Sequence, residues 1–117
     1  MSGKVSYLSG LAAEDSVARA YQGDGRQVAF RRWRGKQGEI DLIVRDRDEV
    51  IFVEVKKSRD FMRAAEALSK AQIKRLYQTA AEFLCSEPNG DLTPSRFDVA
   101  LVNGAGEVQI LENALGY

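Results

Sequence analysis

Hydrophobic residues recur along the chain with two different periods, and the changes of period divide it into helical and extended segments. Between Gly10 and Gln22 the apolar residues return at helical spacing, and glycines follow as helix stop signals. Segments 27–33, 39–45 and 50–56 instead alternate in polarity and are rich in β-branched and aromatic residues, as strands are. The first half of the chain is therefore predicted to form one amphipathic helix and then three strands in series.

The second half of the chain shows one further helix and two further strands. A capping box of the Ser-x-x-Gln form, Ser69 to Gln72, predicts the start of a long helix, and apolar residues recur at helical spacing as far as Leu84. Segments 96–102 and 107–111 lie on either side of a glycine-containing turn, which predicts a closing hairpin. Both prolines lie in the loop between this helix and the hairpin.

The order helix, three strands, helix, two strands predicts a mixed α/β (α+β) fold, in which a central mixed sheet of about five strands is flanked by helices. Segment 60–68 fits either a short helix or an ordered loop. We expect one domain, residues 1–117, because a chain of this length can bury roughly two-thirds of the surface that its unfolded form exposes.

Composition removes several classes of chemistry. The chain has no histidine, which excludes imidazole-based triads and histidine-ligated zinc, so hydrolysis would have to use carboxylates, lysine or a hard metal. Seventeen basic and seventeen acidic residues give a net charge of zero, so only a local cluster could favour nucleic acid. The single cysteine, Cys85, lies in an apolar helical stretch and is predicted to be a buried thiol in a reducing compartment.

The sequence gives no sign of a membrane segment. No stretch is apolar and long enough to cross a bilayer, and the N-terminal residues lack the apolar run of a signal peptide. We therefore expect no membrane partner and a cytoplasmic location.

The hairpin formed by the second and third strands carries the candidate chemistry. If its DRDE connection is an even-length loop, Arg45 pairs with Val50, and in the same register Asp41 lies opposite Glu54. Directly paired residues share a face of a sheet, with Cβ atoms roughly 4.5–5.5 Å apart, and like charges placed so are destabilising. The alternate positions would form one continuous apolar face for the core: Ile40, Leu42, Val44, Ile51, Val53 and Val55.

Two facing carboxylates indicate a hard divalent cation, Mg²⁺ or Mn²⁺, which prefers oxygen ligands and offsets their repulsion. Lys56, two residues beyond Glu54, would project beside the metal and could orient or help deprotonate a water aimed at a phosphorus centre. The alternative is a solvated outer face, with Asp41 and Glu54 simply exposed and Glu39 in a weak cross-strand ion pair with Lys56. Spacing alone does not decide between these interpretations.

The run GEIDLIVRDRDEVIFVEVKKSR, residues 38–59, resembles the YraN family of small bacterial proteins, a branch of the restriction-endonuclease-like PD-(D/E)XK superfamily that also includes Holliday-junction resolvases. The resemblance covers most of the chain, because the helix that carries Glu14, the helix from Ser69 to Leu84 and the segment RFDVALV also have counterparts there. GEIDLI followed by FVEVK is its most specific part.

The resemblance implies a restriction-endonuclease-like core and a set of site residues. Asp41 and Glu54 would be metal ligands, Lys56 the catalytic lysine, and Glu14 an auxiliary acid that reaches the metal from the first helix. Glu39 belongs to the same pattern, with an ion pair to Lys56 as its alternative role. Arg59 follows the catalytic lysine later than the family's usual arginine does, so its role stays open.

A basic stretch lies near the predicted site. It is a candidate contact for phosphate groups, with Trp33 as a possible stacking platform, and it extends past the site. The alternative is that Trp33 and Phe30 enter the core, which we favour for Phe30, while the basic residues are solvated. The candidate nucleic-acid-binding residues are Arg31, Arg32, Arg34, Lys36, Lys57 and Arg59.

Two further polar residues are expected to act structurally. Gln72 lies where many related nucleases place a polar helix residue, but its capping-box role explains it without chemistry. Asp98 falls on an inner strand, where a buried carboxylate needs an arginine or backbone partner.

The sequence therefore predicts a Mg²⁺- or Mn²⁺-dependent endonuclease acting on DNA or structured nucleic acid, with DNA favoured over RNA. The alternatives are a nucleic-acid-binding module that keeps the fold without cleaving, and an interaction domain of a DNA-processing assembly. Cutting both strands of a duplex would need two sites and so favours a homodimer.

Overall fold

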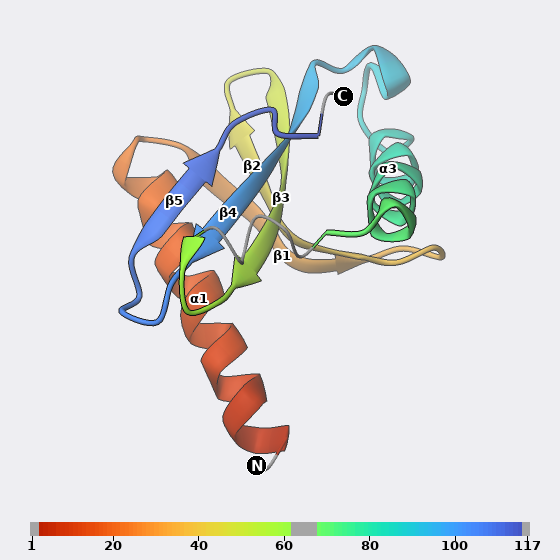
Figure 1. Cartoon of the computed structure of the whole chain (residues 1–117). Coiled ribbons are helices and arrows are strands. Elements are labelled where there is room, and N and C mark those ends of the chain that lie inside the picture. The colour runs from red at the N-terminus through yellow and green to blue at the C-terminus, as the bar shows by residue number, and fades with distance from the viewer. Residues whose placement is uncertain (1–2, 62–67, 116–117) are drawn as a thin grey trace.

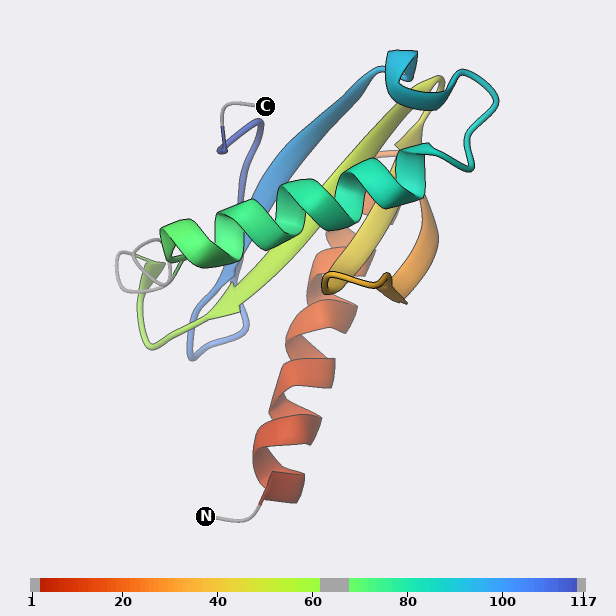
Figure 2. The same cartoon turned by 90° about the vertical axis from the view of Figure 1, so that its right-hand side faces the viewer.

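The chain folds as a five-stranded mixed sheet with one long helix packed on each face (Figures 1 and 2). A computed structural model describes residues 3–61 and 68–115, with side chains from residue 10 onward. The mixed fold and its element order are as predicted. The elements are α1 Gly3–Gly23, β1 Gln27–Arg34, β2 Glu39–Asp46, β3 Glu49–Lys57, α3 Lys70–Leu84, η1 Gly90–Leu92, β4 Ser95–Val102 and β5 Val108–Leu111.

The strands lie in the order β1-β2-β3-β4-β5, and only the central pair β3 and β4 is parallel. Parallel pairing brings the carboxyl ends of these two strands, Lys57 and Val102, to the same edge of the sheet. Between β2 and β3 the loop has two residues, and Arg45 pairs with Val50 and Leu42 with Val53. This confirms the predicted hairpin register.

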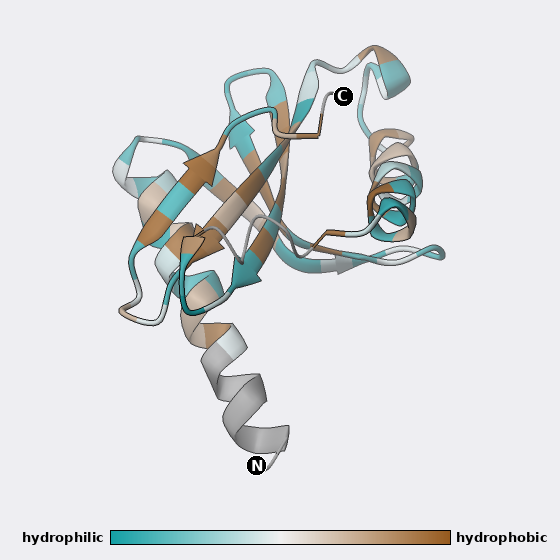
Figure 3. Cartoon of the chain, in the orientation of Figure 1, coloured by the Kyte–Doolittle hydropathy of each residue, from teal (hydrophilic) through white to brown (hydrophobic). Residues whose placement is uncertain are grey.

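The sheet is buried on both faces, which corrects the prediction of one apolar face. Leu42, Val44, Ile51 and Val53 pack against α1, as expected, with Val55 partly buried beside them. A second core fills the space below α3 and contains Ile43, Val50, Phe52 and the helix residues Leu76, Ala80, Phe83 and Leu84. In Figure 3 the hydrophobic colours follow the central strands, and the loops are mainly hydrophilic.

Ile40 belongs to the core under α3 and does not, as predicted, share a face with Leu42 and Val44. Ile43 lies in the same core, although strict alternation would place residues three apart on opposite faces. The strand therefore changes face around Asp41. Across from Asp41, between the paired residues Arg31 and Trp33, stands Arg32, whose backbone φ is 52°. A positive φ is uncommon for a non-glycine residue and marks an irregularity in this hairpin.

Asp98 holds three elements together inside the molecule. Its fully buried carboxylate accepts hydrogen bonds from the Tyr21 hydroxyl at 2.7 Å, from Arg96 Nε at 3.0 Å and from the Asn113 backbone N–H at 3.0 Å. Burial and the bond to Asp98 raise the pKa of Tyr21, so its hydroxyl stays a donor. The structural role predicted for Asp98 is confirmed.

The second helix begins as predicted and ends one residue before the cysteine. The Ser69 side chain accepts from the Gln72 N–H, and the Gln72 side chain accepts from the Ser69 N–H, which is the predicted capping box. Cys85 is the C-cap residue and is exposed, so the prediction of a buried thiol was wrong. Its position lies past the helical face that contacts the sheet. The predicted element at 60–68 falls mostly outside the described residues.

The two aromatic residues of β1 lie against α3. Trp33 and Phe30 both make edge-on ring contacts with Phe83, with ring centroids 5.3 and 5.6 Å apart. Trp33 is partly buried in that core, whereas the core position predicted for Phe30 was wrong: at the margin of the sheet its side chain contacts Phe83 and remains 43% exposed. Within residues 3–61 and 68–115, no helix is both long and apolar enough to cross a membrane.

Candidate functional site

Asp41 and Glu54 meet where the β2–β3 ladder stops. The last paired residues of the two strands are Leu42 and Val53, and next to them Asp41 Oδ2 accepts a hydrogen bond from the Val55 backbone N–H at 2.8 Å. The Asp41 side chain thus lies between the separating strands, where its carboxyl group is close enough to that of Glu54 to raise the pKa of Glu54. The predicted juxtaposition of two acids is therefore present in the fold.

Glu54 points to the face of the sheet that α3 covers. Its neighbours Val53 and Val55 both pack on the α1 side, and Glu54 lines a pocket of about 130 Å³ between the strands and α3. We call this the carboxylate pocket. Its other lining residues are Gly38, Glu39, Gln72, Arg75, Leu76 and Thr79.

Lys56 lies on the same face as Glu54, with its Nζ 3.9 Å from Glu54 Oε2. The two side chains are only 19% and 14% exposed, so this ion pair is largely shielded from solvent. The predicted pair of Glu39 with Lys56 is not formed, because Glu39 Oε2 lies 3.1 Å from Arg34 Nη2. Pairing of β1 with β2 continues to Arg34 and Glu39, whereas pairing of β2 with β3 ends at Leu42.

The environment of Glu54 disfavours its charged form. Burial, followed by the hydrogen bond and the negative charge of Asp41, raises the pKa of Glu54, which reaches about 9 when all neighbouring groups are included. Lys56 opposes this effect, and Glu39 adds to it. Two carboxyl groups in this position are stable together only if they share a proton or a cation.

This arrangement predicts that Glu54→Gln stabilises the metal-free protein as the pH rises. Because the Glu54 pKa is higher in the folded state than in the unfolded state, the folded protein keeps a proton on Glu54 that the unfolded protein releases. The free energy of unfolding therefore falls as the pH rises toward about 9. Glutamine does not ionise. Chemical unfolding in EDTA should show little difference between the two proteins at about pH 5 and a gain of about 1–3 kcal/mol for the variant at about pH 9.

The control for this experiment is Asp91→Asn, which removes one negative charge from an exposed residue of η1. We expect it to leave the pH dependence of unfolding as in the parent chain. A Glu54→Gln variant that is less stable than the parent protein at high pH would show that Asp41 and Glu54 do not repel each other.

Glu14, the predicted auxiliary acid, forms an ion pair with Arg32. Glu14 is buried at the inner side of α1, and its Oε1 lies 3.1 Å from Arg32 Nε. Because Arg32 stands across from Asp41 in the β1–β2 register, this pair lies beside the irregular part of the hairpin. Ligation of a metal by Glu14 would require this ion pair to open and stays a prediction.

The predicted basic stretch is divided among several acids. Arg31 pairs with Asp15 and Arg32 with Glu14 on α1, while Arg34 pairs with Glu39 at the far end of the hairpin. The Lys36 backbone N–H donates to Glu82 of α3 at 2.9 Å, and its side chain is exposed. The remaining two predicted residues, Lys57 and Arg59, line a different pocket on the α1 side. Nucleic-acid contact by these residues stays a prediction.

Helix α3 contributes two residues to the carboxylate pocket that the sequence did not single out. Arg75 and Thr79 line it together with Gln72, which also caps the helix. Polar residues at positions 72, 75 and 79 lie on one face of a helix, and that spacing was the available signal. Within the part of the chain that the structure describes, no three acid or cysteine side chains are grouped as a metal cluster.

Comparison with known proteins places this site in a bacterial family. The model of the family described as "Uncharacterised protein family UPF0102" matches residues 13–102, most of the chain. The chain belongs to the UPF0102 family. A UPF0102 protein of Ruegeria pomeroyi is 60% identical over 115 residues, which cover 98% of this chain and 94% of the relative. One of Cereibacter sphaeroides is 60% identical over 114 residues, covering 97% of each chain.

A third UPF0102 protein, of Roseobacter denitrificans, is 54% identical over 113 residues, covering 97% of this chain and 88% of the relative. The UPF0102 match runs from within α1 to the end of β4. It therefore includes Glu14, Asp41, Glu54, Lys56 and the whole of α3, and it leaves residues 1–12, β5 and the C-terminal residues outside.

Proposed function

We propose that this UPF0102 protein is a Mg²⁺- or Mn²⁺-dependent nuclease that hydrolyses phosphodiester bonds in DNA or structured nucleic acid. One observation carries the proposal: two neighbouring carboxyl groups, Asp41 and Glu54, share a largely shielded site with a lysine Nζ 3.9 Å from the second of them. A purely structural site would gain nothing from placing two acids there, since burial penalises their charge.

The residues present fit a hard divalent cation. Oxygen ligands suit Mg²⁺ and Mn²⁺, and a bound cation would remove the conflict that raises the Glu54 pKa. Two protein carboxylates are enough, because Mg²⁺ keeps several water ligands and commonly completes its shell with substrate phosphate oxygens. Asp41 and Glu54 would hold the ion. When bound, it would stabilise negative charge on the phosphate and lower the pKa of a coordinated water.

The protein groups around the ion have separable tasks. The Val55 N–H fixes one oxygen of Asp41 and so orients its carboxylate toward Glu54. Lys56 presents an ammonium group on the same face, where it can orient the attacking water and balance charge on the phosphate. Arg75 of α3, on the opposite wall of the carboxylate pocket, supplies a further cation for a neighbouring phosphate.

The test is a cleavage assay on single-stranded, duplex and branched DNA and on RNA, each with Mg²⁺, Mn²⁺ or EDTA. We expect at least one substrate to be cut with metal and none with EDTA. Asp41→Asn, which is nearly isosteric and keeps an oxygen for the Val55 N–H, should abolish cutting because it removes a charged ligand.

The matched control is Asp15→Asn, a change of the same type on α1. It should retain cutting. If metal-free binding to nucleic acid is found but no substrate is cut, the protein is a binding module that keeps the fold; if neither is found, the proposal fails.

A further inference from the structure

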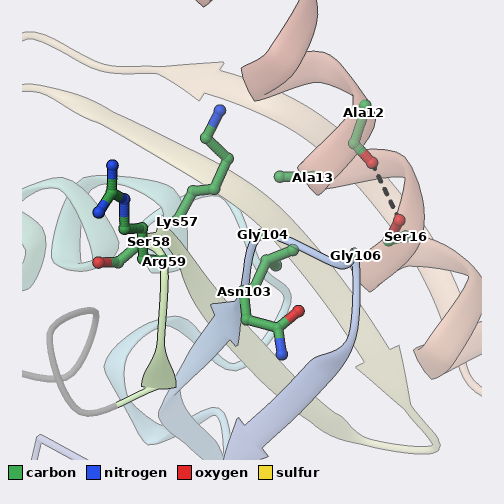
Figure 4. A pocket seen from close by; sticks show the side chains of 10 residues that line it. Ala12, Ala13, Ser16, Lys57, Ser58, Arg59, Asn103, Gly104 and Gly106 are labelled. Carbon is green, nitrogen blue, oxygen red and sulfur yellow. Dashed lines mark hydrogen bonds between the residues drawn. The ribbon is translucent and has the colours of Figure 1, made fainter.

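A second and larger pocket lies on the other face of the sheet, between α1 and the carboxyl ends of the parallel strands β3 and β4 (Figure 4). Its volume is about 380 Å³, within the range of small-molecule sites. Ligands of sheets with parallel strands commonly bind beyond the carboxyl ends of those strands. We call this the α1 pocket.

Two neighbouring lysines lie on opposite faces of the sheet. Side chains alternate along a strand, so Lys56 accompanies Glu54 on the α3 side, while the next residue, Lys57, lines the α1 pocket. In Figure 4 the Lys57 side chain extends from the end of β3 toward α1. The α1 pocket therefore has its own cation, distinct from the one at the carboxylate pocket.

The charge of the α1 pocket is one-sided. Lys57 and Arg59 line it, and among the residues whose side chains the structure describes none of the ten that line it is acidic, although the chain as a whole has equal numbers of acids and bases. A phosphate monoester carries a charge of about −1.5 to −2 at pH 7. Two positively charged side chains therefore balance a phosphate group more closely than they would balance a carboxylate, whose charge is −1. Ser58 adds a hydroxyl group beside these cations, and Ser16 adds one from α1, where its Oγ donates to the Ala12 carbonyl oxygen (Figure 4).

Small and apolar residues form the rest of the pocket. Ala12 and Ala13 of α1 and Val102 of β4 leave room for an uncharged, partly apolar body next to the charged groups. The floor at the β4–β5 turn is held in place by Asn103, whose Oδ1 accepts from the Ala105 and Glu107 N–H groups. The pocket is thus partly formed by a hydrogen-bonded turn, which lowers the cost of ordering it around a ligand.

We propose that the α1 pocket binds a nucleoside 5′-monophosphate, either as the free nucleotide or as the 5′-phosphorylated end of a nucleic-acid strand. Lys57 and Arg59 contact the phosphate, and the alanine and valine side chains contact the sugar and base. This binding needs no metal and no cleavage, because the α1 pocket and the carboxylate pocket lie on opposite faces of the sheet.

The experiment is a set of separate titrations of the full chain in EDTA, one each with AMP, adenosine, inorganic phosphate and a 5′-phosphorylated trinucleotide. Binding is measured by calorimetry and by amide NMR. We expect AMP to bind more tightly than adenosine or phosphate and to shift the amide signals of Ser58 and Gly104 but not that of Gln72. A trinucleotide that binds more tightly than AMP identifies a strand end as the ligand, and the reverse identifies the free nucleotide. Both results support the proposal.

Two variants localise the binding. Lys57→Gln should weaken the binding of AMP about tenfold or more, because a charge-assisted contact is lost. Ala12→Leu, at an exposed helix position that lines the α1 pocket, should weaken AMP binding by a similar factor, because the larger side chain would occupy part of the pocket. Lys74→Gln, an exposed lysine of α3, is the matched control and should bind AMP as the parent chain does.

The proposal is overturned if AMP does not bind, if adenosine binds as tightly as AMP, or if both pocket variants bind AMP like the control. Shifts confined to residues of the carboxylate pocket would also overturn it. None of these results depends on nuclease activity, so failure here and failure of the proposed function are distinguishable.

Discussion

Replacing Lys56 by alanine is expected to lower the rate of metal-supported cleavage by about a hundredfold or more while the metal still binds. The Lys56 ammonium lies 3.9 Å from Glu54 Oε2, on the face that would receive the phosphate, and a positioned acid–base group typically contributes about 10²–10⁴-fold. The measurement is the single-turnover rate at saturating substrate, together with the Mn²⁺ dissociation constant from calorimetry.

Metal binding should weaken only slightly in Lys56→Ala. Lys56 lowers the Glu54 pKa, so its removal makes Glu54 harder to ionise and metal binding must release its proton at a higher cost. Lys74→Ala, an exposed lysine of α3, is the control and should retain the parent rate. If Lys56→Ala cuts as fast as this control, Lys56 has no part in the chemistry.

The pairing of Asp41 with Glu54 could be predicted from the sequence because it depends on local regularities. A two-residue loop sets the register of the hairpin, and the two-residue period of a strand then decides which side chains share a face. The same reasoning placed Lys56 beside Glu54. The capping box of α3 is equally local, since Ser69 and Gln72 satisfy each other within one turn.

The features that were predicted wrongly lie where the pairing of the strands becomes irregular or ends. Ile40 changes face beside the irregular residue Arg32, whose side chain is held by Glu14 of α1, 18 residues earlier. Glu39 pairs with Arg34 because the pairing of β1 with β2 extends to these two residues, whereas the pairing of β3 with β2 ends at Leu42. Strand periodicity assumes a regular ladder, so it could not locate the point where this ladder ends.

The α1 pocket could not be predicted for a similar reason. It forms only because β4 pairs in parallel with β3 after a crossover through α3, which brings Asn103 and Gly104 next to Lys57 and Arg59. The sequence showed the basic residues and the glycine-containing turn, but it gave no order for the strands. Tertiary topology therefore decided which basic residues share a pocket.

Replacing Asp98 by alanine is expected to lower the free energy of unfolding by about 3–4 kcal/mol. The change leaves the buried Tyr21 hydroxyl and the Asn113 N–H without their acceptor, and it deprives Arg96 of its shortest ion pair. Arg96 keeps contacts to Glu49 and Glu112 at 3.4 and 3.6 Å, which places the loss toward the lower end of the range for a broken buried pair. Urea unfolding followed by the fluorescence of Trp33, the single tryptophan, measures the effect.

Two further variants separate the charge of Asp98 from its hydrogen bonds. Asp98→Asn keeps an acceptor for Tyr21 and should cost less than Asp98→Ala, whereas Asp91→Ala, at an exposed position in η1, should change stability by less than about 0.5 kcal/mol. In a double-mutant cycle, Tyr21→Phe should cost less in the Asp98→Ala background than in the parent chain, because its partner is already gone. Equal effects of Asp98→Ala and Asp91→Ala would mean that the buried carboxylate does not hold α1, β4 and the segment after β5 together.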